Sequence, residues 1–212
     1  MADTRPLLIS RRTLVMASLA PTAALAARGK VVTLLGDSIT AGLGLPGRDA
    51  LPNQLHLALE RLGVANIVRG AGVSGDTTAG GAARMDFSIR PDTSVVVVAL
   101  GANDLLQGLD TRTTRANLER ILNRLKQRHM GVVLAGLRAP PELGRGYARD
   151  FDAVFSDIAR RQGVALYPDL LAGVMRNRAL VQSDGLHPNA KGVAVIARGL
   201  APVVAKVLAT RP

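Results

Sequence analysis

From Lys30 onward the chain alternates between short apolar runs rich in β-branched residues and longer windows with apolar residues at helical spacing. Five runs predict strands: KVVTLL at 30–35, NIVR at 66–69, SVVVVAL at 94–100, GVVLAG at 131–136 and VALYP at 164–168. The third run has no polar alternation, which is typical of a parallel strand covered by helices on both faces. The alternation therefore predicts βαβ units around a central parallel sheet.

Four windows predict amphipathic helices, over about 50–62, 111–129, 147–162 and 190–208. In the second window we expect Thr111 or Thr113 to cap the start of the helix and Gly131 to end it. We expect Pro202 to kink or break the last helix. The apolar residues predicted to face inward in these two windows are Leu118, Ile121, Leu122, Leu125, Val193, Ile196, Leu200, Val204 and Leu208.

These elements predict an α/β fold, a three-layer α/β/α sandwich with a flavodoxin-like parallel sheet of about five strands. The chain has 212 residues, of which 48% are apolar, and this is enough for one well-buried core. We find no internal repeat, low-complexity linker or second domain boundary. We therefore expect residues 27–212 to form one domain.

The first 26 residues have a different composition. Arg11 and Arg12 precede an Ala-rich apolar run that ends in Ala24-Leu25-Ala26, as in a signal peptide. The arginine pair is typical of a twin-arginine signal, although a general secretory signal would look almost the same. The run is shorter than the roughly twenty residues of a membrane span. We expect an exported protein, periplasmic or secreted, without stable membrane insertion.

Composition limits the partners. The formal charge is +11 and falls to +9 when residues 1–26, with one acid and three arginines, are removed. The arginines are scattered, which favours a solvated basic surface, and contact with anionic lipid surfaces stays open. Aromatic residues make up 2% of the chain and Trp is absent, so we expect no nucleic-acid partner. The absence of cysteine excludes disulfides and thiolate chemistry.

Candidate chemistry gathers after the predicted strands, where open α/β sheets hold their ligands. Ser38 follows the first strand, Gly75 the second and Asn103 the third, while Asp184 and His187 lie three residues apart before the last helix. A serine that attacks an acyl carbon needs a base, a group that orients the base, and donors for the oxyanion. Each part has a candidate among these residues.

The other two histidines fit structural roles better. His56 lies inside a helix pattern, and His129 falls in the last turn of another, where it can interact with the helix dipole. Asp37 and Asp104 are assigned no chemical role, and each could cap a helix or brace the backbone.

Four blocks, "GDSIT", "GVSGDTTAGG", "GANDLL" and "DGLHPN", resemble those of the SGNH, or GDSL, hydrolase superfamily in order and spacing. With "SGDTT" and "LRAP…GRGYARDF", the chain is most similar to the bacterial periplasmic thioesterase/lysophospholipase/arylesterase branch. The resemblance implies that Ser38 is the nucleophile, His187 the base and Asp184 its orienting acid. It also implies an oxyanion hole made by the N–H groups of Ser38 and Gly75 and the amide of Asn103. Ile39 stands where the family name has Leu, a small change in shape.

The resemblance favours a small acyl ester, aryl ester, thioester or lysophospholipid as substrate, with no metal and no organic cofactor. We expect the acyl group to lie against four leucines: Leu105, Leu106, Leu109 and Leu143. A carbohydrate O-acetyl esterase of the same superfamily is the alternative. Outside the hydrolases, "GAGVSG" at 70–75 matches a Gly-x-Gly-x-x-Gly nucleotide-binding pattern, and a lipid-surface-binding module is a third possibility.

Overall fold

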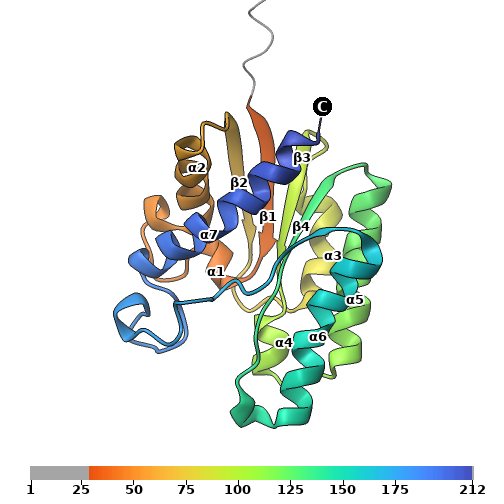
Figure 1. The fold of residues 1–212 in the computed structure, drawn as a ribbon, viewed down its shortest axis with the longest axis vertical. Helices are drawn as coiled ribbons and strands as arrows, with labels where there is room; N and C mark the ends of the chain where they lie inside the picture. The colour runs from red at the N-terminus through yellow and green to blue at the C-terminus, as the bar shows by residue number, and fades with distance from the viewer. Residues whose placement is uncertain (1–28, 212) are drawn as a thin grey trace, which may run out of the picture.

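A parallel five-stranded sheet forms the centre of the computed structural model, which describes residues 29–211 (Figure 1). The strand order is β2-β1-β3-β4-β5, and every neighbouring pair is parallel. The α/β prediction is confirmed, and each predicted run overlaps one strand. The predicted signal peptide lies outside the described residues. The strands are β1 (Lys30–Gly36), β2 (Asn66–Gly72), β3 (Thr93–Ala99), β4 (Gly131–Ala135) and β5 (Ala165–Tyr167).

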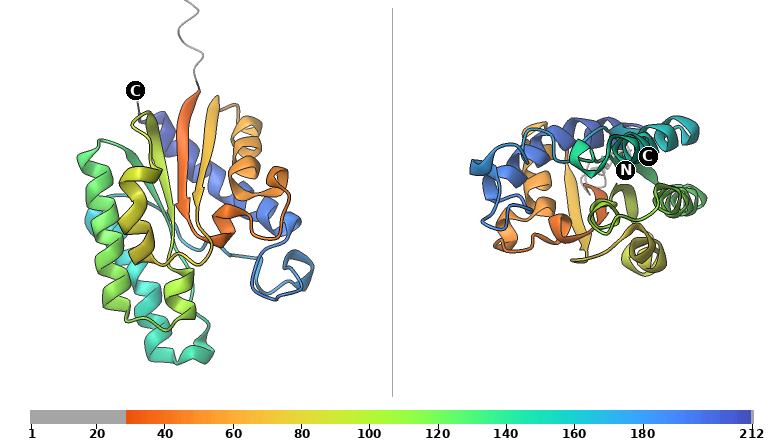
Figure 2. Two further views of the ribbon diagram at one scale, coloured as in Figure 1. Left: turned by 180° about the vertical axis from the view of Figure 1, so that it is seen from behind. Right: turned by 90° about the horizontal axis from the view of Figure 1, so that it is seen from below.

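Helices cover both faces of the sheet. On one side lie α2 and α7, and on the other lie α3, α5 and α6 (Figures 1 and 2). Short helices follow β1 and β3 directly. The helices are α1 (Ser38–Ala41), α2 (Leu51–Arg61), α3 (Thr78–Ser88), α4 (Ala102–Leu106), α5 (Thr111–Gln127), α6 (Arg145–Gln162) and α7 (Ala190–Ala209). Three single turns of 3-10 helix complete the set: η2 (Gly47–Asp49), η3 (Pro141–Leu143) and η4 (Arg178–Leu180).

The core lies between these layers. The side chains of β3 from Val95 to Val98 are completely buried, as the uninterrupted apolar run predicts. All nine inward-facing residues predicted for α5 and α7 are buried. Burial of apolar area is the main stabilising term for such a fold, at about 25 cal/mol per Å².

Helix α7 runs unbroken through Pro202, so the predicted break does not occur. Its length and apolar composition would suit a membrane span. However, its apolar stripe packs on β3, β4 and β5 and against α2. These contacts identify α7 as a core helix of the sandwich.

The predicted ends of α5 are wrong. Asp110, one residue earlier than expected, is the N-cap, and its carboxylate accepts a hydrogen bond from the Arg112 N–H at 2.8 Å. The helix ends at Gln127, so His129 lies beyond its last turn, with a φ of 55°. Gly131 is already the first residue of β4.

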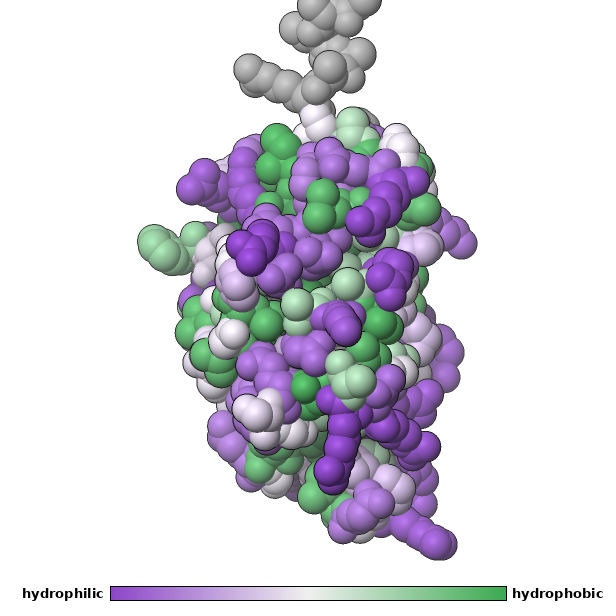
Figure 3. All heavy atoms as spheres, turned by 90° about the vertical axis from the view of Figure 1, so that its left-hand side faces the viewer, coloured by the Kyte–Doolittle hydropathy of each residue, from purple (hydrophilic) through white to green (hydrophobic). Residues whose placement is uncertain are grey.

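The outer surface mixes hydrophilic and apolar residues. On the face shown in Figure 3, hydrophilic residues alternate with smaller apolar groups. This pattern is typical of a surface in contact with water.

Asp104, in α4, is fully buried and joins three helices. Its carboxylate accepts hydrogen bonds from the Thr78 N–H at 2.8 Å, from the Thr78 hydroxyl, and from the Thr114 hydroxyl at 3.1 Å. Thr78 begins α3 and Thr114 lies in the first turn of α5. This carboxylate therefore fixes the position of α4, which carries Asn103.

Replacing Asp104 with Ala should lower the free energy of unfolding by about 3–5 kcal/mol, because three buried donors lose their acceptor. Urea denaturation followed by circular dichroism measures the change. The control is Asp110→Ala, which removes an exposed carboxylate and should cost much less. Equal losses in the two variants would contradict the proposed importance of the buried contacts.

Candidate active site

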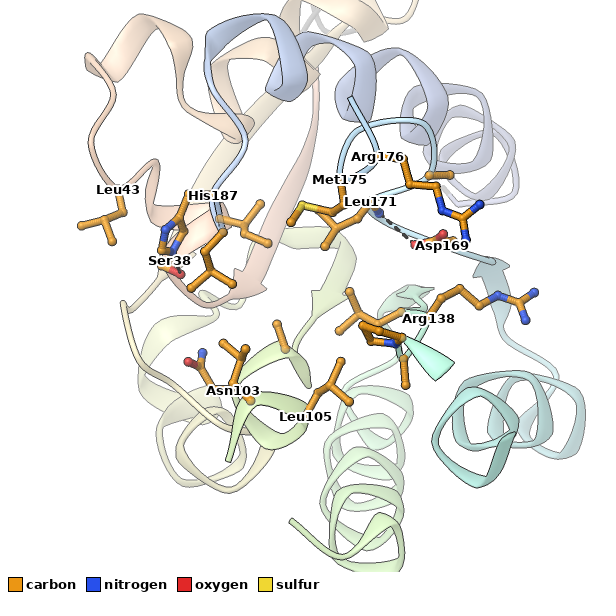
Figure 4. Close-up of a pocket in the computed structure, with 18 of the residues that line it drawn as sticks. Ser38, Leu43, Asn103, Leu105, Arg138, Asp169, Leu171, Met175, Arg176 and His187 are labelled. Carbon is orange, nitrogen blue, oxygen red and sulfur yellow. Dashed lines mark hydrogen bonds between the residues drawn. The ribbon is translucent and has the colours of Figure 1, made fainter. Parts of the chain in front are cut away.

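Three neighbouring strand ends form one edge of the site. Ser38 begins α1 directly after β1, Gly75 lies in the loop after β2, and Asn103 is in α4 after β3. All three line one cavity, where Ser38 and Asn103 face a common space (Figure 4). The structure thus brings together the residues that the sequence places at three separate strand ends.

The sharp turn from β1 into α1 presents Ser38. Asp37 is the N-cap of α1, and its carboxylate accepts a hydrogen bond from the Ile39 N–H at 3.0 Å. At Gly36 the helix approaches the strand closely, because an added Cβ would lie 2.0 Å from the Thr40 hydroxyl oxygen. Only glycine at this position allows α1 to start so near the strand.

His187 reaches Ser38 from the loop before α7. Its Nε2 lies 2.9 Å from the Ser38 Oγ, and its Nδ1 lies 2.6 Å from Asp184 Oδ2. The other oxygen of Asp184 accepts hydrogen bonds from the N–H groups of Leu186, at 2.9 Å, and His187, at 3.0 Å. A hydroxyl, an imidazole and a carboxylate therefore form one continuous chain of contacts.

Gln182 holds this loop in place. Its N–H donates to the His187 carbonyl at 2.8 Å, and its side-chain amide donates to the carbonyls of Leu43, at 2.8 Å, and Pro188, at 3.0 Å. Leu43 lies just after α1, so this amide connects the loop of His187 to the segment of Ser38.

The hydrogen bonds to Asp184 keep its carboxylate charged. The two backbone N–H groups and the imidazole of His187 lower its pKa from 3.8 to about 2. With Nδ1 facing this carboxylate, Nε2 of a neutral imidazole is free to accept a proton from a hydroxyl. The arrangement can therefore activate the Ser38 oxygen as a nucleophile.

Hydrogen-bond donors line the same cavity as this oxygen. Within residues 29–211, neither the Ser38 N–H nor the Gly75 N–H donates a hydrogen bond to another group of the chain. The amide of Asn103 donates one of its two hydrogens to the Asp76 carbonyl at 2.8 Å and keeps the second. Such donors can stabilise negative charge that develops on a bound oxygen.

Asp37 has the opposite electrostatic environment to Asp184. Burial raises its pKa from 3.8 to about 6, and the nearby charge of Asp76 adds a smaller increase. The hydrogen bond from Ile39 and the charge of His187 oppose the rise only in part. Loss of hydration therefore outweighs the backbone hydrogen bonds to this carboxylate.

The cavity has a volume of about 600 Å³ and mostly apolar walls. Of the four leucines expected to lie against the acyl group, Leu105 and Leu106 line the cavity, whereas Leu109 and Leu143 do not. Leu109 lies beyond α4, where its carbonyl accepts a hydrogen bond from the Tyr147 hydroxyl, and Leu143 projects from η3 with 52% of its surface exposed. At the end far from Ser38 the cavity meets Arg138, Asp169 and Arg176 (Figure 4).

Sequence reasoning missed several lining residues. Leu171 and Met175 come from the long loop after β5, which has no periodic pattern to mark them. Leu43 and Leu186 flank Ser38 and His187 in sequence, and this proximity was the only available signal. His56 and His129 lie outside the cavity lining, and His56 contacts Asn66 at 2.9 Å instead.

The glycine pattern at 70–75 is divided between β2 and the loop that follows it. Gly70 and Gly72 belong to β2, and α3 begins only at Thr78. A dinucleotide site needs this pattern to form the turn from a strand directly into a helix. The structure therefore gives the nucleotide-binding alternative no support. Among the described residues, no group of three or more His, Asp or Glu side chains could hold a metal ion.

Comparison with known proteins gives a consistent result. Residues 34–195 match the model of the GDSL-like Lipase/Acylhydrolase family. The chain is 33% identical to an arylesterase of Vibrio mimicus over 176 residues, which cover 82% of this chain and 88% of that protein. It is 32% identical over 165 residues to thioesterase 1/protease 1/lysophospholipase L1 of Escherichia coli K12, covering 77% of this chain and 78% of that protein.

A solved structure is also similar. The crystal structure of AlinE4, an SGNH-hydrolase family esterase, superposes with a TM-score of 0.71. The two chains are 39% identical, and the match covers 84% of this chain and 96% of AlinE4.

The raised pKa of Asp37 should make stability depend on pH. The folded chain holds this proton more tightly than the unfolded chain does, so stability should fall as pH rises from about 4 to about 6. Asp37→Asn keeps an oxygen for the Ile39 N–H but cannot ionise. The stability of this variant relative to the wild type should therefore rise by on the order of 2–3 kcal/mol between pH 4 and pH 7.

Urea denaturation at several pH values measures both proteins. Parallel stability curves would contradict the raised pKa.

Proposed function

Because the chain belongs to the GDSL-like lipase/acylhydrolase family and is an enzyme that hydrolyses acyl esters, we propose that Ser38, His187 and Asp184 are its catalytic triad. The observation that carries the proposal is the continuous contact of Ser38 with His187 at 2.9 Å and of His187 with Asp184 at 2.6 Å. The ionised Asp184 orients the imidazole and stabilises it when it becomes protonated.

The reaction proceeds in two steps. The Ser38 Oγ forms a bond to the acyl carbon while His187 Nε2 takes the hydroxyl proton. The tetrahedral intermediate collapses, the bond to the leaving alcohol or thiol breaks, and His187 returns the proton to that group. Water then attacks the acyl enzyme with His187 again as base, which releases the acid and restores Ser38.

The oxyanion of each intermediate is stabilised by three donors: the N–H of Ser38, the N–H of Gly75 and the side-chain amide of Asn103. The two N–H groups make no other hydrogen bond within the described part of the chain, so they are available to substrate. Donors held in place before the reaction need no reorganisation as charge develops, and each is worth roughly 3–4 kcal/mol.

The cavity walls favour an extended acyl or aryl group over an acetyl group. Its volume of about 600 Å³ lies within the range of small-molecule sites, and leucines and Met175 line its walls (Figure 4). The named relatives include an arylesterase and a thioesterase/lysophospholipase. We therefore propose medium-chain acyl esters, thioesters, aryl esters or lysophospholipids as substrates.

Residues 1–26 are proposed to direct export of the enzyme to the periplasm or the medium. The support is the arginine pair at 11–12 followed by a short apolar run. Removal of residues 1–26 takes away three arginines and one acid and leaves a formal charge of +9. This charge allows weak attraction to anionic lipid surfaces.

Replacing Ser38 with Ala should lower kcat for p-nitrophenyl butyrate by on the order of 10⁶, and a fluorophosphonate probe should no longer label the protein. Ser156→Ala, which changes an exposed serine of α6, is the matched control and should keep full activity and labelling. Activity of Ser38→Ala within tenfold of the wild type would rule out the assignment.

Chain-length preference tests the substrate class. Among acetyl, octanoyl and palmitoyl p-nitrophenyl esters, octanoyl should have the highest kcat/KM, because each buried methylene contributes about 0.8 kcal/mol until the cavity is full. Leu105→Ala should reduce the advantage of octanoyl over acetyl, whereas Leu62→Ala, at the exposed end of α2, should not. A strict preference for acetyl would instead support an O-acetyl esterase.

A further inference from the structure

Arg84 is a largely buried cation beside the site, and the mechanism above does not use it. It lies on α3, and only 20% of its side chain is exposed. Its guanidinium donates to Asp76 Oδ2 at 2.5 Å, to the Gly36 carbonyl at 2.9 Å and to the Ser88 hydroxyl at 3.0 Å. Two of these partners, Gly36 and Asp76, lie within two residues of Ser38 and Gly75 in the proposed oxyanion hole.

Gly36 is the last residue of β1 and lies two residues before Ser38. Asp76 directly follows Gly75, and its main-chain carbonyl accepts the hydrogen bond from the Asn103 amide at 2.8 Å. One guanidinium thus joins the Ser38 segment to the Gly75 segment, and Asp76 extends the connection to Asn103. Every proposed oxyanion donor is attached to this network.

The conformation of the loop makes the connection to Asp76 important. The Asp76 N–H donates to the Val73 carbonyl at 3.1 Å, and Gly75 has a φ of 84°. A turn closed by this hydrogen bond, with positive φ at its third residue, is of type II and strongly favours glycine there. The orientation of the turn sets the direction of the Gly75 N–H, and Asp76 is the residue through which Arg84 holds that turn.

A guanidinium suits this role because it is planar and rigid. Its nitrogens donate in fixed directions, so the Gly36 carbonyl and the Asp76 carboxylate are held at a set separation. The Asp76 side chain is only 15% exposed, so salt screens the pair far less than it screens an exposed one. A lysine ammonium is a single point donor and does not reproduce this geometry.

We propose that Arg84 is a positioning residue for acyl transfer, which holds the Ser38 and Gly75 segments and, through Asp76, Asn103 in the arrangement that stabilises the oxyanion. The proposal rests on the function assigned above. It assigns Arg84 no contact with substrate, and it predicts an effect on the chemical step rather than on substrate binding.

The test measures kcat and KM for p-nitrophenyl butyrate in Arg84→Ala and Arg84→Lys. The value of kcat is calculated per active site, counted by titrating the enzyme to completion with a fluorophosphonate probe, so unfolded protein does not lower it. In Arg84→Ala, kcat should fall about 10- to 100-fold while KM changes less than about threefold, as expected for misplaced transition-state donors. Arg84→Lys keeps the positive charge beside Asp76 and should also lose about tenfold or more in kcat.

Arg124→Ala is the matched control. Arg124 donates to Asp86 of α3 at 2.9 Å on the surface, so the substitution removes the same charge and a contact to the same helix. Its kcat should stay within about twofold of the wild type, as for most surface substitutions. A normal kcat per titrated site in both Arg84 variants, or a loss confined to KM, would overturn the proposal.

A double-mutant cycle with Asn103→Ala tests the connection through Asp76. If Arg84 acts by positioning Asn103 and its neighbours, Arg84→Ala should cost clearly less in the Asn103→Ala background than in the wild type. Fully multiplicative losses would overturn the proposed connection. Failure of the triad assignment is separate, because it would appear as activity and labelling in Ser38→Ala, whatever the Arg84 variants do.

Discussion

The whole site depends on three parallel strand ends that meet where the strand order reverses. β1 lies between β2 and β3. Helix α2, between β1 and β2, packs on one face of the sheet, and helix α5, between β3 and β4, packs on the other. A crevice at the carboxyl ends of the strands follows from this topology. Ser38, Gly75 and Asn103 need no long loops to converge there, because strand pairing already places them next to one another. Only His187 and Asp184 come from elsewhere, and Gln182 fixes their loop to the segment that follows Ser38.

Two aspartates near Ser38 show how local donors set charge. Asp184 is half exposed, yet three hydrogen bonds lower its pKa to about 2. Asp37 is almost completely buried, its backbone hydrogen bonds compensate the lost hydration only in part, and its pKa rises to about 6. The contrast follows from the balance between lost hydration and compensating hydrogen bonds. The imidazole therefore has a partner on its loop that stays charged above about pH 3, and near it lies a second carboxyl whose charge changes at mildly acidic pH.

The parts that the sequence predicted correctly are those with a strong local signal. The run from Val95 to Leu100 marks a buried strand, and the four family blocks mark the residues that meet at the site. Helices α1 and α4 were missed because four or five residues are too few to show a period. In α3, Gly80 and Gly81 weaken the helical pattern, so packing rather than propensity selects the helix.

Contacts between distant segments left no sequence signal. Leu171 and Met175 line the cavity only because the loop after β5 folds over it, and Leu109 does not line it although it lies only six residues after Asn103. Arg84 is one arginine among many in the printed sequence, and only the structure distinguishes it from Arg124.

The late position of His187 in the chain has a consequence for biosynthesis. Ser38 is translated early, but its proposed base, His187, lies 149 residues later and is followed by α7, which packs on one face of the sheet. In the proposed mechanism, a chain that ends before His187 therefore carries the serine hydroxyl without the imidazole that activates it, and activity requires the C-terminal part of the chain.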